Sequence, residues 1–94
     1  MDRTEHEIAR GERARQLLEE PLIVEAFALI EREYQQAWQD SPARDVEARE
    51  KLYLSLKNLA KVKAHLTHVM ESGTLAKATL AQRAGRTLKA AFSR

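Results

Sequence analysis

Two histidines are spaced so that they could share a ligand. His65 and His68 are three residues apart, which places both imidazoles on one face of a helix. Imidazoles in this arrangement can bind one metal ion. No carboxylate lies within one turn on their N-terminal side, however, and Lys57 and Lys61 on the same face would repel a cation. We therefore expect no metal site here; the histidines are expected to be solvated, with a role in an interface as the alternative.

Motifs for catalysis are missing from the sequence. There is no glycine-rich phosphate loop, no nucleophile elbow and no Glu-x-x-His pair that would suit a di-metal bundle. The chain has no Cys, which excludes disulfides and thiolate metal sites. We expect a protein that is not an enzyme, with no cofactor and no small-molecule substrate.

Charge is divided unevenly along the 94 residues. The net charge is +2, but residues 1–50 carry seven Arg against thirteen acids, a balance of −6, and residues 51–94 carry nine Lys and Arg against one acid, a balance of +8. In one interpretation the two halves pair within the chain and set an antiparallel register. In the other, the basic side chains meet an acidic partner such as nucleic acid, a membrane or an acidic protein surface. The candidates for that contact are Lys57, Lys61, Lys77, Arg83, Arg86, Lys89 and Arg94.

The elements that must position these side chains are helices. Three helix breakers interrupt the apolar periodicity, namely Pro21, Pro42 and Gly73. Four helices are expected between them, at about 4–20, 21–39, 42–71 and 74–92. Pro21 suits the first turn of the second helix, and a single kinked helix over residues 5–39 is the alternative.

The residues around the last two breakers suggest where helices begin and end. Ser41 is expected to cap the third helix, with Pro42 in the first turn and Asp45 completing a capping box. Gly73 is expected to end that helix as its C′ residue. Thr74 is then expected to cap the fourth.

The second and third helices predict a long antiparallel hairpin, because both are long and few residues join them. With the turn near residue 42, the numbers of facing residues should add up to about 84, which places Glu33 near Lys51. Glu33 and Lys63 each fall on an apolar face, either as markers of register or as side chains that reach solvent at its edge. Three aromatic residues near the turn, Tyr34, Trp38 and Tyr53, are expected to close the end of the core or to anchor an interface.

Apolar surface exceeds what one hairpin can bury. The apolar arc of the second helix covers roughly 180°, wider than a two-helix seam, so this helix needs two neighbours. The fourth helix has an alanine-rich apolar face that also needs a partner. The whole chain, residues 1–94, is expected to form one domain, with 74–94 as a separable basic docking helix. The residues expected to meet an oligomer partner are Leu22, Ile23, Phe27, Ile30, Tyr34, Trp38, Leu80, Leu88 and Phe92.

One stretch resembles a known group of proteins. Residues 37–45 (AWQDSPARD), followed by residues 49–53 (REKLY), are similar to a pattern in small helical proteins of tailed bacteriophages and prophages, over about residues 17–75. The resemblance implies a phage setting near head and packaging functions, without an assigned activity. The basic C-terminal segment is similar in character to the coat-binding ends of phage scaffolding proteins.

These observations together predict an all-α protein that forms a homo-oligomer. Its expected role is that of an adaptor, scaffold or packaging-associated component of a phage particle. The alternatives are a nucleic-acid-binding regulator and a phage-encoded inhibitor of a host protein. The polar N-terminus and the short apolar runs predict a protein of the host cytoplasm or the virion with no contact to membranes.

Overall fold

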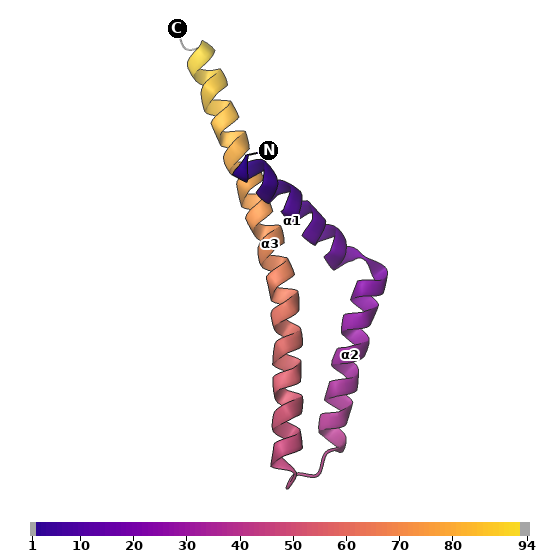
Figure 1. Cartoon of the computed structure of the whole chain (residues 1–94). Coiled ribbons are helices and arrows are strands. Elements are labelled where there is room, and N and C mark those ends of the chain that lie inside the picture. The colour runs from indigo at the N-terminus through magenta and orange to yellow at the C-terminus, as the bar shows by residue number, and fades with distance from the viewer. Residues whose placement is uncertain (1, 93–94) are drawn as a thin grey trace.

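Three helices form the fold. The computed structural model describes residues 2–92, and their side chains as far as residue 89. The helices are α1 (Arg3–Glu19), α2 (Pro21–Asp40) and α3 (Val46–Phe92) (Figure 1). No strand occurs in this part of the chain. The expected all-helical class is confirmed.

The first two helices are separate and meet at Glu20. Glu20 has extended backbone (φ −68°, ψ 122°), and its carboxylate caps α2 by accepting a hydrogen bond from the backbone N–H of Ile23 at 2.9 Å. Pro21 occupies the first turn of α2, where a missing N–H costs nothing. The break predicted at this proline is therefore confirmed, and residues 5–39 do not form one kinked helix.

The connection between α2 and α3 differs from its prediction. The Ser41 hydroxyl donates to the carbonyl of Trp38 at 2.6 Å and so closes the end of α2. The N-cap of α3 is Asp45, whose carboxylate accepts from the backbone N–H of Ala48 at 3.2 Å. The prediction that Ser41 begins the third helix was wrong, because its hydroxyl is engaged by the preceding helix. α3 begins at Val46.

The break predicted at Gly73 is also wrong. α3 continues through this residue, and no glycine of the described chain has the positive φ typical of a C′ residue. The Thr74 hydroxyl donates to the carbonyl of Met70 at 3.2 Å, the bond of a helix interior rather than of a cap. Residues 74–92 therefore belong to the same helix as residues 46–73.

The molecule is long and thin. α3 has 47 residues and is about 70 Å long at 1.5 Å per residue, which accounts for extents of 76 × 24 × 20 Å. α1 crosses α3 obliquely, and α2 continues in the same general direction, antiparallel to the first half of α3 (Figure 1). Beyond the crossing, α3 extends past the start of α1, and Arg83 still lines a crevice with Thr4 and Glu7 of that helix. Residues 80–89 are called the arm of α3 below. The radius of gyration is 21.0 Å, against about 12 Å for a compact chain of this length.

Candidate interaction surfaces

The tightest packing lies where α1 crosses α3. A Cβ atom added to Gly11 would lie 2.6 Å from the Cα of Gly73, and one added to Gly73 would lie 2.7 Å from the Cα of Gly11. Ala14 and Ala76, each three residues further along its helix, are 3% and 6% exposed and are the buried hydrophobic side chains of the described residues. Small residues at these four positions let the two backbones approach closely. Gly73 therefore permits the close approach of α1 and α3, and it does not end a helix.

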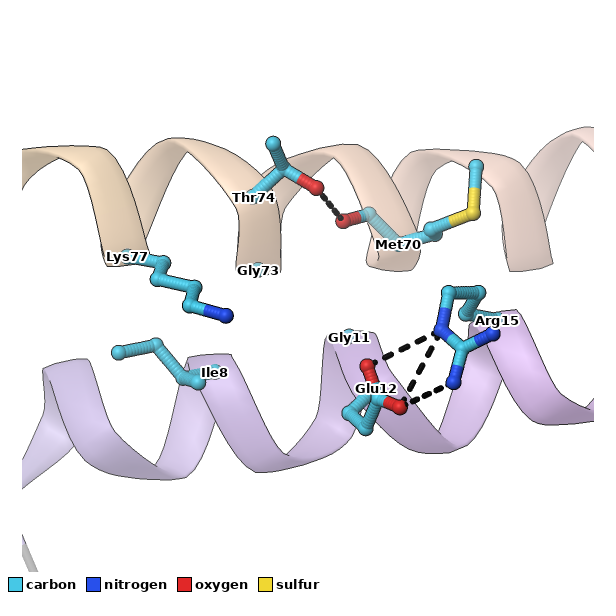
Figure 2. Close-up of a pocket in the computed structure, with 8 residues that line it drawn as sticks. All are labelled: Ile8, Gly11, Glu12, Arg15, Met70, Gly73, Thr74 and Lys77. Carbon is cyan, nitrogen blue, oxygen red and sulfur yellow. Dashed lines mark hydrogen bonds and ion pairs between the residues drawn. The ribbon is translucent and has the colours of Figure 1, made fainter.

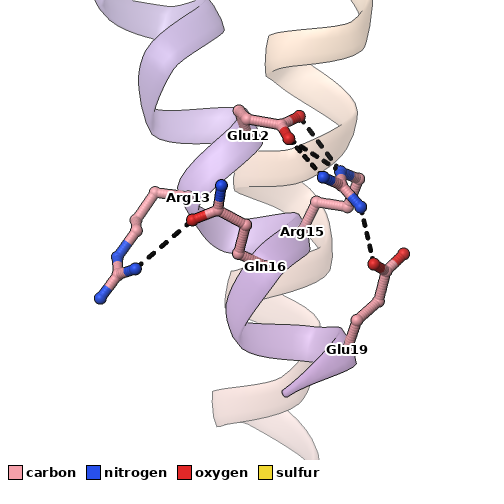
Figure 3. A network of polar contacts seen from close by, with 5 residues as sticks. All are labelled: Glu12, Arg13, Arg15, Gln16 and Glu19. Atoms are coloured by element: carbon pink, nitrogen blue, oxygen red, sulfur yellow. Dashed lines mark hydrogen bonds and ion pairs between the residues drawn. The ribbon is translucent and has the colours of Figure 1, made fainter.

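An open crevice of about 530 Å³ lies along the crossing (Figure 2). Glu12 and Arg15 of α1 form an ion pair at its edge, and Lys77 reaches toward it from α3. Arg15 also pairs with Glu19 at 2.6 Å, so one guanidinium bridges two carboxylates (Figure 3). The hydrogen bonds from Arg15 hold the pKa of Glu12 below its usual value, and the charge of Lys77 acts in the same direction. At the edge of the crevice, Glu12 and Arg15 therefore already have ion-pair partners.

Replacing Arg15 with glutamine is expected to raise the pKa of Glu12 toward its usual value. Ionised Glu12 gains its partner in the folded state, so its contribution to stability is present above the usual glutamate pKa. That contribution is lost as the pH falls through the lowered pKa. The effect on stability is small because the pair is solvent-exposed. Titration of the side-chain carboxyl carbons by NMR measures the shift.

Arg13→Gln is the matched control for this titration. Arg13 donates to the amide oxygen of Gln16 at 3.4 Å rather than to a carboxylate, so its loss should leave the Glu12 midpoint in place (Figure 3). Equal Glu12 midpoints in the Arg13 and Arg15 variants would contradict the assigned ion pair.

The predicted partner-facing residues of α2 divide between two sides of the helix. Those that are half-buried on the side of α3 are Ile23, Phe27 and Tyr34. Leu22 and Ile30 remain exposed on another side, and Trp38 is also exposed although Arg49 of α3 lies against its ring. The ammonium of Lys63 lies 6.0 Å from the centre of the Phe27 ring, and both residues line a crevice between the helices. One side of α2 therefore faces α3, and another has no neighbour in the chain.

The uncovered side is called the outer face of α2. Its members share exposure and helical spacing, and they are Leu22, Ala26, Leu29, Ile30, Glu33 and Ala37. Leu22 is 70% exposed, Leu29 50% and Ile30 37%. Leu29 was missed as a partner-facing residue, although it lies seven residues, or two helical turns, after Leu22. Glu33 is exposed on this face, so it does not lie in the seam with α3.

Near the turn, Arg49, which was not predicted as a contact residue, packs against the ring of Trp38. The guanidinium carbon of Arg49 lies 4.2 Å from the centre of the Trp38 ring, and Arg49 also donates to the Ser41 hydroxyl oxygen at 3.1 Å. Trp38 remains 42% exposed and Tyr53 54% exposed, so neither closes a core. The ammonium of Lys57 lies 5.4 Å from the Tyr53 ring.

The register between α2 and α3 is shifted from the predicted one. The numbers of facing residues add up to 87 for Trp38 and Arg49 and to 90 for Phe27 and Lys63, because α3 begins at residue 46. Among the described residues, each ion pair lies within one helix. Lys51 pairs with Glu47 of its own helix at 3.3 Å and not with an acid of α2. The acidic and basic halves of the chain therefore do not offset each other across α2 and α3.

The predicted basic residues form one exposed row and several separate positions. Lys57, Lys61, Arg83 and Arg86 are exposed and share a face of α3 at helical spacing. Lys77 lies instead beside α1, at the crevice. Lys89 is exposed. Arg94 and the side chain of Phe92 lie outside what the structure describes, whereas Leu80 and Leu88 of the arm are exposed.

The two histidines lie beside α1. His65 and His68 line a shallow crevice of about 190 Å³ with Glu7 and Arg10. Across the described part of the chain, no group of three or more His, Asp or Glu side chains could hold a metal ion. The structure therefore gives these histidines an acidic and a basic neighbour from α1 but no ligand set.

Neither the helices nor the comparisons add a further site. None of the helices, as far as they are described, combines the length and apolarity needed to span a membrane. Searches of protein-family models, curated proteins and solved structures found no match. The functional proposal below therefore rests on the exposed surfaces of the chain.

Proposed function

We propose that the protein is a non-enzymatic helical interaction protein that self-associates through apolar helix faces. The observation that carries this proposal is its surface area. The chain exposes 7745 Å², whereas a compact monomer of 10.7 kDa exposes about 5,500 Å². The excess of roughly 2,200 Å² equals the area that a chain gives up in a large, obligate interface.

The distribution of that surface supports the same conclusion. Two alanines are the buried hydrophobic side chains of the described chain, while Leu, Ile and Val side chains along α2 and α3 stay exposed. Ordering each residue costs about 1–2 kcal/mol of conformational entropy, which burial must offset. Two buried alanines supply little of that burial, so the remainder is expected to come from another copy.

Sedimentation equilibrium at micromolar concentration tests the proposal. We expect a mass of at least twice that of the 10.7 kDa chain. Self-association is expected to persist in high salt, because apolar burial carries it and salt screens only charge pairs. A monomer over the whole concentration range would contradict the proposal.

A second candidate function is binding to nucleic acid through the basic row of α3. Lys57, Lys61, Arg83 and Arg86 are exposed on one face, and α1 borders this face between the two pairs, at His65 and His68. The same sedimentation experiment with duplex DNA added distinguishes this function. Binding to phosphates would weaken steeply as salt is raised, unlike the contact between copies.

The proposed setting is a phage particle, in which the protein would act as an adaptor or scaffold. The support for this part of the proposal is the resemblance of residues 37–53 to small phage proteins. A long, open helical shape fits such a role, because it presents its surfaces along a length of 76 Å.

A further inference from the structure

Two apolar surfaces are uncovered at opposite ends of the molecule. One is the outer face of α2. The other is the arm of α3, where Leu80 is 40% exposed and Leu88 59% exposed, with exposed Ala84 between them at a four-residue spacing. The arm points away from α2, so neither surface covers the other within one chain (Figure 1). Each surface therefore needs a second molecule.

We infer that the arm of one copy docks on the outer face of α2 in a second, antiparallel copy, and that the second arm docks in the same way on the first copy. A two-fold pair makes each contact twice, which doubles the burial obtained from one pair of surfaces. This inference rests on the self-association proposed above, and it specifies which surfaces meet.

Helix lengths place the two surfaces at the same level along the helix axes if the two α3 helices overlap fully. The midpoint of α3 is residue 69, so facing residues of two fully overlapped antiparallel α3 helices have numbers that add up to about 138. Facing residues of α2 and α3 within one chain have numbers that add up to 87–90. An arm residue then lies beside the α2 residue numbered about 50 lower. This offset puts Leu80 beside Ile30 and Leu88 close to Ala37.

The charges on the two surfaces support the same offset of about 50 residues. This offset places Arg83 of the arm at the level of Glu33 of the outer face. Neither residue belongs to an ion pair within the described chain, although Arg83 lines a crevice with Glu7, which itself pairs with Arg3. α2 carries four acids and one arginine, whereas the arm carries three cations and no acid. An arginine opposite Glu33 would satisfy the one charge that interrupts the apolar outer face.

The available area also suits a second copy. A stable interface of ordinary size buries about 800 Å² on each partner, well within the excess surface of roughly 2,200 Å² per chain. Two reciprocal arm contacts, with the α2 helices that receive them, draw on both uncovered surfaces. A partner that met the arm alone would leave the outer face of α2 exposed.

Cross-linking between introduced cysteines tests the pairing directly, because the natural chain has no cysteine. The variants Ile30→Cys and Leu80→Cys are mixed, equilibrated and treated with a short bis-maleimide. We expect a covalent dimer of about twice 10.7 kDa on a denaturing gel. Each single variant alone should stay uncross-linked, because identical positions lie far apart in an antiparallel pair. Gln35→Cys mixed with Leu80→Cys is the matched control, since Gln35 lines the side of α2 that faces α3.

The outcomes separate this inference from the proposed function. A wild-type protein that sediments as a monomer would overturn both. A wild-type dimer without the cross-link between positions 30 and 80 would overturn the arm contact and leave self-association standing. A cross-link in the Leu80→Cys variant alone would show that two arms meet each other and would also overturn the inference.

Charge reversal gives a second measurement that does not depend on cross-linker geometry. Glu33→Arg and Arg83→Glu are each expected to weaken dimerisation about tenfold, and the double variant should return to within about threefold of the wild type. Far-UV circular dichroism checks that each variant is helical. If Arg83→Glu lowers the affinity for duplex DNA while dimerisation stays unchanged, the arm binds an anionic polymer, and the inference fails.

Discussion

Replacing Gly73 with alanine is expected to lower the free energy of unfolding by about 1–3 kcal/mol, the usual cost of forcing a group into a filled space. The new Cβ would lie 2.7 Å from the Cα of Gly11, so the backbones of α1 and α3 must move apart. Their separation would also expose Ala14 and Ala76, the buried side chains of this contact. Urea unfolding followed by circular dichroism, at one fixed protein concentration, measures the change.

Gly85 offers a matched control in the same helix. A Cβ added there meets nothing within 4 Å, so Gly85→Ala differs from Gly73→Ala only in what the methyl group contacts. Alanine should stabilise this position by up to about 1 kcal/mol through helix propensity. Opposite signs for the two variants are expected. Equal stabilisation by both would contradict the crossing of α1 and α3.

The misplaced helix boundary shows what a sequence pattern could not decide. Glycine is favoured at a C′ position and at a close helix crossing for the same reason, the absence of a Cβ. Two features of the sequence distinguish a helix crossing from a C′ position, but their meaning is clear only once the structure is known. Gly11 and Gly73 are each followed by alanine three residues later, and no proline stops the chain after Gly73.

The cap of α3 shows a similar limit. Ser41 and Asp45 both precede helix-forming residues, and either could serve as an N-cap by composition. The choice depends on Trp38, whose carbonyl accepts from the Ser41 hydroxyl and so leaves Asp45 as the cap. Pro21 was predictable because its missing N–H permits few positions other than the first turn. The changed start of α3 also shifted the register by several residues.

The two faces of α2 were largely predictable from periodicity. An apolar arc wider than one seam indicates two neighbours, and the structure supplies α3 for one of them. Periodicity could not say which residues face α3, because that depends on how α1 directs the chain into α2. Pairing of opposite charges also failed as a guide, since Lys51 found its partner, Glu47, within one turn of its own helix.

Replacing Leu29 with glutamate is expected to convert the associated protein to monomers. Leu29 lies in the middle of the outer face of α2 and is 50% exposed in the single chain. Fully burying a leucine is worth about 1.5–3 kcal/mol, and about half of that remains for a side chain that is already half-buried. A symmetric pair loses this contribution twice, so the dissociation constant should rise at least about tenfold. Sedimentation equilibrium over a dilution series measures this constant.

Leu54→Glu separates a specific surface from general hydrophobicity. Leu54 is 51% exposed, almost the same as Leu29, but lies on α3 near the basic row rather than on the outer face of α2. A glutamate there faces Lys57 one turn later and should be tolerated without a change in mass. If both substitutions produced monomers, exposed leucine in general would drive association. If only Leu29→Glu did so, the contact lies on the outer face of α2, where its apolar residues surround Glu33 and leave that carboxylate needing a cation from another chain.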